Sequence, residues 1–246
     1  MALTDSLVYV YEFNEGSAVD AVDTLGGTSL TQNGTIASAA GIVLGARDIE
    51  ADSTDNFSAA SSSVFQAGDI DITWRAVFKL ESLVQRGVFS KWGDGDASGN
   101  EYLLYRDPDG NLYFFVRDVA NANNASVNSG ATIAVDTWYD VICGHDSVNN
   151  LLFLQVNGGT RQTTSFSGGI RSGTNTFRAG SWATTSPLDG LIDELWCWKN
   201  RVISSAEAVT LWNGGDPLTY AEASGATWVP PVGAFCVNTN RLIRGV

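Results

Sequence analysis

The stretch LDGLIDELWCWKNRVIS, residues 188–204, decides the fold. Its first half is a run of large apolar residues of the kind that forms a buried β-strand. It ends at Ser204, whose hydroxyl can accept a hydrogen bond from an early backbone N–H of a helix. The stretch therefore predicts a strand followed by the start of a helix.

A second informative stretch, SLVYVYEFNEGS at residues 6–17, predicts a strand that ends in a glycine-containing turn. Between the two stretches, runs rich in Val, Ile, Phe, Tyr, Trp and Thr recur about every 8–14 residues, which is typical of an all-β sandwich. Hairpins are predicted at residues 107–110 and 157–159, since glycine accepts positive φ. Residues 118–132 are predicted to form a surface loop or a weak edge strand.

These two stretches resemble the ends of laminin-G-like domains, which are concanavalin A-like sandwiches. The family opens on apolar-Tyr-x-Phe-Asp/Asn-Glu-Gly-Ser and closes on Gly-x-Ile-Asp-Glu-Val, followed by a short Ser-capped helix. The matching residues are Tyr11, Phe13, Asn14, Glu15, Gly16, Ser17, Gly190, Ile192, Asp193, Glu194, Leu195, Arg201 and Ser204. The resemblance covers roughly residues 5–215. It implies an all-β, concanavalin A-like jelly-roll sandwich of two antiparallel sheets with one short C-terminal helix.

The domain organisation follows from a change of pattern near residue 217. Residues 1–216 are predicted to form the sandwich, with the helix between Ser204 or Ser205 and Gly214. Residues 217–246 lack a clean period and are predicted to form a C-terminal arm. One interpretation is a loosely ordered terminus. The other is an arm that docks on another subunit through apolar and basic residues such as Trp228, Phe235, Arg241 and Arg244.

The composition limits the partners. Lys and Arg number 14 against 27 Asp and Glu, which gives a net charge of −13. This charge repels phosphate backbones and anionic membrane surfaces, so neither nucleic acid nor a membrane is an expected partner. No apolar stretch approaches membrane-spanning length, and the N-terminus lacks the basic and apolar regions of a signal peptide. Three cysteines without a short-spaced pair argue against a disulfide framework, and Cys143 and Cys197 are expected to be buried.

Catalytic patterns are weak. Related glucanases carry two carboxylates on one strand as Glu-x-Asp-x-x-Glu, and no such string occurs here. Only its first spacing occurs, at residues 69–71 and 50–52. The single histidine, His145, is expected at a strand end, and no Gly-x-Ser-x-Gly elbow is present. We therefore expect the protein not to be an enzyme, with a glycoside hydrolase as an alternative.

Calcium is the metal that the resemblance implies. Similar domains often hold calcium between the loop after the first strand and the Asp of the closing motif, which here are Asp20 or Asp23 and Asp193. Asp193 lies in an apolar strand, where its carboxylate needs a cation, an arginine or backbone donors. A second stretch, DGDASG at residues 94–99, matches half of a calcium loop but lacks its terminal Glu, so a hairpin loop is favoured there.

Tryptophans are the candidate ligand-binding residues, because sugar-binding sandwiches stack sugar rings on exposed aromatic faces. Trp74 and Trp138 are in register with apolar strand positions and are expected in the core. Trp92 and Trp182 lie near predicted loops and are the candidates for contact with a glycan.

Taken together, these patterns favour a non-enzymatic structural or binding module. An acidic chain with this opening and no export signal looks like a virion protein of a tailed bacteriophage, assembled in the host cytoplasm as a capsid decoration, fibre or tail-associated protein. The expected partners are other virion proteins, its own copies in a homo-oligomer, and a host glycan. The alternatives are a secreted or cell-surface lectin module and a glycoside hydrolase of the same fold class.

Overall fold

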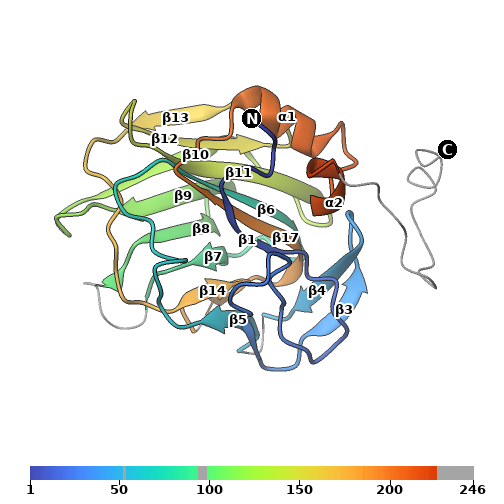
Figure 1. Cartoon of the computed structure of the whole chain (residues 1–246). Coiled ribbons are helices and arrows are strands. Elements are labelled where there is room, and N and C mark those ends of the chain that lie inside the picture. The colour runs from blue at the N-terminus through green and yellow to red at the C-terminus, as the bar shows by residue number, and fades with distance from the viewer. Residues whose placement is uncertain (52–53, 94–98, 185, 226–246) are drawn as a thin grey trace.

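The computed structural model describes residues 1–51, 54–93, 99–184 and 186–225. Within these residues the chain forms two large antiparallel sheets that pack face to face (Figure 1). This arrangement confirms the two-sheet jelly-roll sandwich predicted from the sequence.

The first sheet has eight strands, of which seven form a path and the eighth, β1 (Leu7–Tyr11), pairs with β17. In spatial order the seven are β13 (Gln162–Ser165), β12 (Leu151–Val156), β11 (Trp138–Asp146), β6 (Ile72–Leu80), β17 (Gly190–Lys199), β4 (Gly45–Ile49) and β3 (Ala37–Ala40). The two sequence stretches that identified the fold, β1 and β17, are thus neighbours near the middle of this sheet.

The second sheet has seven strands. In spatial order they are β10 (Asn124–Thr132), β9 (Asn111–Arg117), β8 (Tyr102–Arg106), β7 (Arg86–Ser90), β14 (Phe177–Ala179), β5 (Asn56–Ala59) and β2 (Thr31–Asn33). A small ribbon of β15 (Ser181–Trp182) and β16 (Ser186–Pro187) contacts β7.

Alternating side chains from the two sheets fill the main core. On β6, Trp74, Ala76, Phe78 and Leu80 all point into it, as the alternation of apolar residues predicts. The indole N–H of Trp74 donates to the hydroxyl of Tyr9 on β1 at 3.0 Å, so the polar atom of this buried ring has a partner.

The outer face of the eight-stranded sheet is covered. Helix α1 (Ser205–Trp212) and the N-terminal segment pack on it around Trp196 and Trp198 and form a second apolar cluster (Figure 1). Ser204 caps α1 in a capping box with Glu207, which confirms the helix predicted from the sequence.

A second helix was not predicted. Helix α2 (Tyr220–Ala223) begins after Thr219, which forms its own capping box with Glu222. Leu218, Tyr220 and Ala223 join the second apolar cluster. The first part of the predicted arm therefore packs on the sandwich. Trp228, Phe235, Arg241 and Arg244 lie outside the described residues.

Other local predictions have mixed outcomes. Both hairpins form, between β8 and β9 and between β12 and β13, and residues 124–132 are an edge strand. Cys143 and Cys197 are buried. The core prediction holds for Trp74 and is wrong for Trp138, which is partly exposed beneath the ammonium group of Lys79. His145 lies at the end of β11 but is fully buried, with Nδ1 3.2 Å from the carbonyl oxygen of Ile70.

Neither helix in the described part of the chain is long and apolar enough to cross a membrane.

Candidate functional site

The outer face of the seven-stranded sheet carries a row of partly exposed aromatic rings. Strand β9 alternates strictly between buried and partly exposed positions. Leu112, Phe114 and Val116 enter the core, so Tyr113 and Phe115 point outward. Tyr105 on β8 is paired with Tyr113 and shares its face. No helix covers this face among the described residues.

Trp92 and Trp182 join the same row from the ends of their strands. The ring centroids of Trp92 and Phe115 are 5.1 Å apart, and those of Tyr105 and Trp182 are 5.5 Å apart. Tyr105 links the two pairs, with its centroid 6.4 Å from that of Phe115. We call Trp92, Tyr105, Tyr113, Phe115 and Trp182 the aromatic row. The structure thus brings together the two tryptophans that the sequence singled out.

The small ribbon positions Trp182. The hydroxyl of Ser90 on β7 donates to the carbonyl oxygen of Ser181 at 3.0 Å. The Trp182 backbone also crosses so close to Gly87 that a Cβ there would lie 2.3 Å from the Trp182 nitrogen. Gly93, which follows Trp92, also lies beside the ribbon, because a Cβ added there would lie 2.8 Å from Cβ of Ala183 and 3.5 Å from Nε1 of Trp182.

A buried ion pair supports the strand ends that carry Trp92. The ammonium of Lys91 is 3.0 Å from Oε1 of Glu101, and both side chains are fully buried. Glu101 also accepts hydrogen bonds from the backbone nitrogens of Ala67 and Gly173. Burial raises the pKa of Glu101, while Lys91 acts to lower it. This pair ties two loops to the strands beneath the aromatic row.

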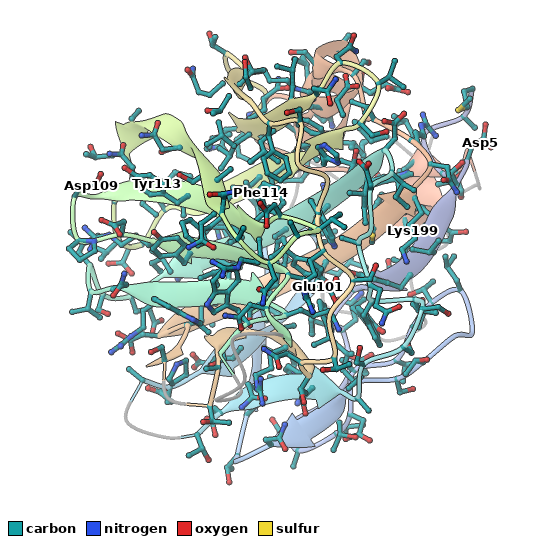
Figure 2. The ribbon with its side chains drawn as sticks, turned by 90° about the vertical axis from the view of Figure 1, so that its left-hand side faces the viewer. Asp5, Glu101, Asp109, Tyr113, Phe114 and Lys199 are labelled. Atoms are coloured by element: carbon teal, nitrogen blue, oxygen red, sulfur yellow. The ribbon has the colours of Figure 1, made fainter. Side chains whose placement is uncertain are left out.

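Hydrogen bonds fix the tyrosines at the other end of the row. The Tyr113 hydroxyl donates to Oδ2 of Asp109 at 2.8 Å and accepts from the amide of Asn128. Figure 2 shows Tyr113 and Asp109 together at the edge of the molecule, with Phe114 nearer its centre. Burial and the nearby carboxylate of Asp107 raise the pKa of Tyr105, so this phenol stays neutral and keeps its donor hydrogen.

A polar hollow of about 270 Å³ lies on the same face beyond the small ribbon. Its lining is free of aromatic rings and consists of Asn33, Thr54, Asn56, Ser58, Arg178 and Thr184. We call it the amide hollow. Thr184 lies two residues after Trp182, so the ribbon separates the amide hollow from the aromatic row.

The outward-facing positions of the described strands of this sheet lack carboxylates, although Asp107 and Asp109 lie in the hairpin beside Tyr105 and Tyr113. Where the described strands of this sheet point outward, they carry aromatic, amide, hydroxyl or arginine side chains, together with Leu103 and Gly87, and neither Asp nor Glu. A glycoside hydrolase needs two carboxyl groups facing each other across its substrate. The arrangement can hold a ligand by stacking and hydrogen bonding.

The three predicted calcium ligands accept hydrogen bonds from backbone nitrogens. Oδ1 of Asp23 accepts hydrogen bonds from the nitrogens of Val10 and Leu25, and Oδ2 accepts from that of Gly27. Asp23 thus accepts three backbone hydrogen bonds in this structure.

Asp193 and Asp20 also accept backbone hydrogen bonds. The fully buried Asp193 accepts one from Val43 at 2.8 Å, and Asp20 accepts one from Gln32 at 2.9 Å. In the described residues, no three His, Cys, Asp or Glu side chains cluster in a way that could hold an ion. Residues 94–98 of the second calcium stretch lie outside the described part.

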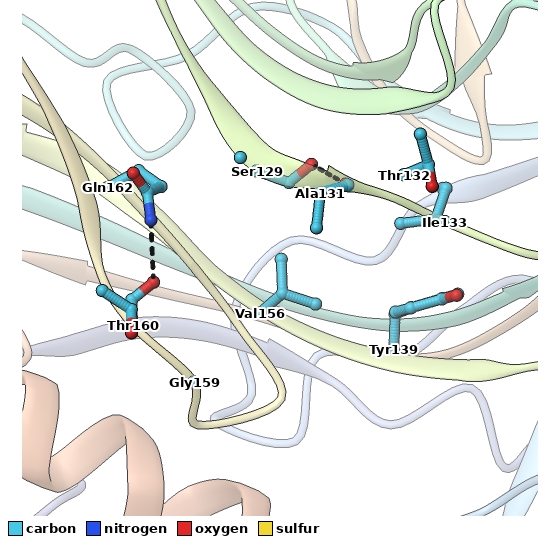
Figure 3. Close-up of a pocket in the computed structure, with 10 residues that line it drawn as sticks. Ser129, Ala131, Thr132, Ile133, Tyr139, Val156, Gly159, Thr160 and Gln162 are labelled. Carbon is cyan, nitrogen blue, oxygen red and sulfur yellow. Dashed lines mark hydrogen bonds between the residues drawn. The ribbon is translucent and has the colours of Figure 1, made fainter.

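A further hollow, of about 330 Å³, opens between the edges of the two sheets (Figure 3). Ile133, Tyr139 and Val156 form its apolar part, and Thr160 and Gln162 belong to the turn and strand that follow β12. The Tyr139 hydroxyl already accepts from the backbone of Ala134 at 2.7 Å. This hollow exposes the edge of the core, and the hydroxyl of Ser129 in its wall donates to the carbonyl oxygen of Ala131 at 2.6 Å.

Comparison with known families agrees with this architecture. Residues 51–209 match the family model described as the concanavalin A-like lectin/glucanases superfamily. The chain belongs to this superfamily. The matched region is well over half of the chain and contains the whole aromatic row and all of the amide hollow except Asn33. No relative was found among curated proteins by sequence.

Solved structures share this fold at low sequence identity. Domain 4 of AbnA, a GH43 extracellular arabinanase from Geobacillus stearothermophilus solved with arabinotriose, matches with a TM-score of 0.64 and 18% identity. The match covers 83% of this chain and 97% of that domain. The receptor-binding domain of botulinum neurotoxin D matches with a TM-score of 0.62 and 13% identity, over 87% of this chain and 54% of that one. The binding domain of Paraclostridial Mosquitocidal Protein 1 is similar at 0.66 and 13%, over 86% and 52%.

The sequence analysis missed three of the five rings in the row. Tyr113 and Phe115 are two residues apart in NLYFFVR, a spacing that places both on one face of a strand. Leu112, Phe114 and Val116 are equally apolar, so the alternation alone did not show which face is exposed.

Proposed function

We propose that this chain is a non-enzymatic carbohydrate-binding module that holds a glycan on the outer face of its seven-stranded sheet. The observation that carries the proposal is the aromatic row, five partly exposed rings on a face that no described helix covers. Aromatic faces stack on the apolar faces of sugar rings, while neighbouring polar groups bind the hydroxyls.

Known sugar complexes of similar folds support this class of ligand. Domain 4 of the arabinanase was solved with arabinotriose, and the binding domain of botulinum neurotoxin D was solved with N-acetylneuraminic acid. Identities of 18% and 13% transfer the fold and not the sugar, so the glycan has to come from experiment.

The non-enzymatic part of the proposal is supported by the lack of Asp and Glu at the outward positions of the described strands of this sheet. Stacking without a facing acid and base binds a glycan but does not cleave it. A screen of plant, bacterial and host polysaccharides should show no turnover. Turnover that a single Asp or Glu substitution abolishes would instead favour the hydrolase alternative.

A glycan array followed by titration calorimetry tests the binding. Trp92→Ala and Trp182→Ala should each weaken binding about tenfold or more, which corresponds to about 1.4 kcal/mol. Trp138→Ala is the matched control, because Trp138 is a partly exposed tryptophan on the other sheet. Equal losses in all three variants, or no binding by the wild-type protein, would overturn the proposal.

We also propose, from the sequence, that the setting is a virion in which residues 217–246 attach the module to its own copies or to other particle proteins. The support is the apolar and basic composition of this segment and the packing of Leu218 and Tyr220 on the sandwich, which anchors the start of the segment. Truncation after Gly225 should then leave a folded module that no longer assembles. An unchanged oligomeric state and particle attachment would refute this role.

A further inference from the structure

The aromatic row and the amide hollow lie on one transverse line of the seven-stranded sheet. Phe115 on β9 pairs with Leu103 on β8, and Leu103 pairs with Ser90 on β7. Ser90 pairs with Arg178 on β14, which pairs with Ser58 on β5. Neighbouring strands are about 4.8 Å apart, so Phe115 and Ser58 are separated by four steps, or about 19 Å.

Hydrogen bonds orient the polar groups of the amide hollow. The Asn33 nitrogen Nδ2 donates to Oδ1 of Asn56 at 3.0 Å and to Oγ of Ser58 at 2.9 Å. Nδ2 of Asn56 in turn donates to the carbonyl oxygen of Thr54 at 2.8 Å. Both amide nitrogens are therefore committed inside the protein, which fixes both amide planes.

Two polar groups in the hollow retain unused hydrogen-bonding capacity. Among the described residues, Oδ1 of Asn33 accepts no hydrogen bond, and the Ser58 hydroxyl accepts one without donating its own proton. Both residues are partly exposed and line the hollow. An acceptor and a donor held this close together match the hydroxyl groups of a sugar ring, each of which both donates and accepts.

The chemistry of the hollow favours an uncharged ligand. Arg178 in its wall is only 6% exposed and has interaction partners within the protein. We therefore assign it to the wall of the hollow and not to the groups that bind the ligand. The net charge of −13 opposes the approach of an anionic chain.

We propose that the amide hollow is a second sugar subsite, so that the sheet face binds a linear, uncharged oligosaccharide. One part of the chain stacks on the aromatic row, and a later sugar is held through its hydroxyls by Asn33 and Ser58. This inference rests on the proposed carbohydrate binding. The ligand must span more than the roughly 19 Å, or four strand spacings, from Phe115 to Ser58, because the small ribbon covers Ser90 on this line and the chain has to pass over it.

The test compares short and long chains. The probes are disaccharides to octasaccharides of the uncharged arabino-, xylo-, gluco- and manno- series, titrated by calorimetry into the full chain. In the wild-type protein, affinity should rise with chain length and level off once both subsites are filled. Asn33→Ala and Ser58→Ala should each weaken binding of the octasaccharide about five- to tenfold, the effect of one lost hydrogen bond. Binding of the disaccharide should not change.

Controls separate this inference from the function on which it rests. Trp92→Ala should weaken short and long chains alike, and Thr163→Ala on the exposed edge strand β13 should change neither. Thermal melting checks that each variant is folded. If Asn33→Ala does not fold, Ser58→Ala alone tests the second subsite. Octasaccharide binding that survives both substitutions would refute the second subsite and leave the carbohydrate-binding function standing. Failure of the wild-type protein to bind any of the probes, or any glycan on the array, would refute both.

Discussion

The backbone of Trp182 lies directly over Gly87, where an added Cβ would come within 2.3 Å of the Trp182 nitrogen. Backbone atoms cannot tolerate so short a separation, so position 87 must lack a side chain for β15 to cross β7 at this height. Because the Trp182 ring contacts Tyr105, this glycine sets the position of one end of the aromatic row.

Gly87→Ala should therefore displace the small ribbon. We expect the free energy of unfolding to fall by about 1–3 kcal/mol, as for other overpacked sites. Glycan binding should weaken about as much as in Trp182→Ala. Denaturant unfolding and calorimetry measure the two effects. Gly16→Ala is the control, because its added Cβ meets nothing within 4 Å. If Gly87→Ala behaves like Gly16→Ala, the glycine does not position Trp182.

The sequence predicted the fold well because the fold depends on patterns that are local. The strand that ends at Tyr11, the strand that holds Asp193 and the helix capped by Ser204 are each visible in a short stretch, and they occur in the order that the family requires. The capping box of Thr219 and Glu222 was equally visible, but a helix of one turn leaves no apolar period to detect.

The site was predicted only in part because it depends on which face of a sheet stays open. Helix α1 and the N-terminal segment cover Trp196 and Trp198 on the outer face of the eight-stranded sheet. The outer face of the seven-stranded sheet is therefore the one that stays open. Trp138 shows the same limit. Its spacing fits the core, but it begins strand β11, and its ring lies on the outer side, against Lys79.

Calcium binding at Asp193 remains a proposal with a clear outcome. If this buried carboxylate is a ligand of calcium, the melting midpoint rises with calcium and falls with chelator, and Asp193→Asn removes the difference. Scanning calorimetry with calcium and with chelator measures it. Asp20→Asn, at an exposed position, tests the second predicted ligand. Equal midpoints in the wild-type protein would mean that backbone donors such as the Val43 nitrogen compensate the carboxylate without an ion.

The ion pair of Lys91 and Glu101 should be essential to the fold around Trp92. Glu101→Gln leaves the buried ammonium of Lys91 without its counter-charge, so we expect a loss of about 3–5 kcal/mol in the free energy of unfolding. Removing both charges, with Lys91→Met added, should recover part of that loss. Glu12→Gln, at a partly exposed carboxylate, should change stability by no more than about 0.5 kcal/mol. A double variant less stable than Glu101→Gln would contradict this account.

Glu194 should make the protein less stable as the pH rises. Its carboxyl is fully buried, and Oε1 has no hydrogen-bond partner among the described residues, while Oε2 accepts from the indole N–H of Trp196 at 2.6 Å. Burial first, and the neighbouring carboxylate of Asp193 second, raise the pKa of Glu194 well above its usual range. The folded protein therefore binds this proton more tightly than the unfolded chain does. The resulting stability is complete below the unfolded pKa of about 4.3 and is lost as the pH rises through the folded pKa.

Glu194→Gln keeps the shape of the protonated side chain and removes the titration. In chelator, this variant should be more stable than the wild-type protein at neutral pH, and the difference should shrink toward pH 4, about the unfolded pKa. Glu207→Gln should do the opposite. Burial acts to raise the pKa of Glu207, but hydrogen bonds from Ser204 and the ion pair with Arg201 outweigh it, so this pKa is lowered. Removing the Glu207 carboxylate therefore destabilises the folded protein at neutral pH. Denaturant midpoints measured across pH for the three proteins decide the matter. Parallel wild-type and Glu194→Gln curves would show that Glu194 does not change its protonation on unfolding.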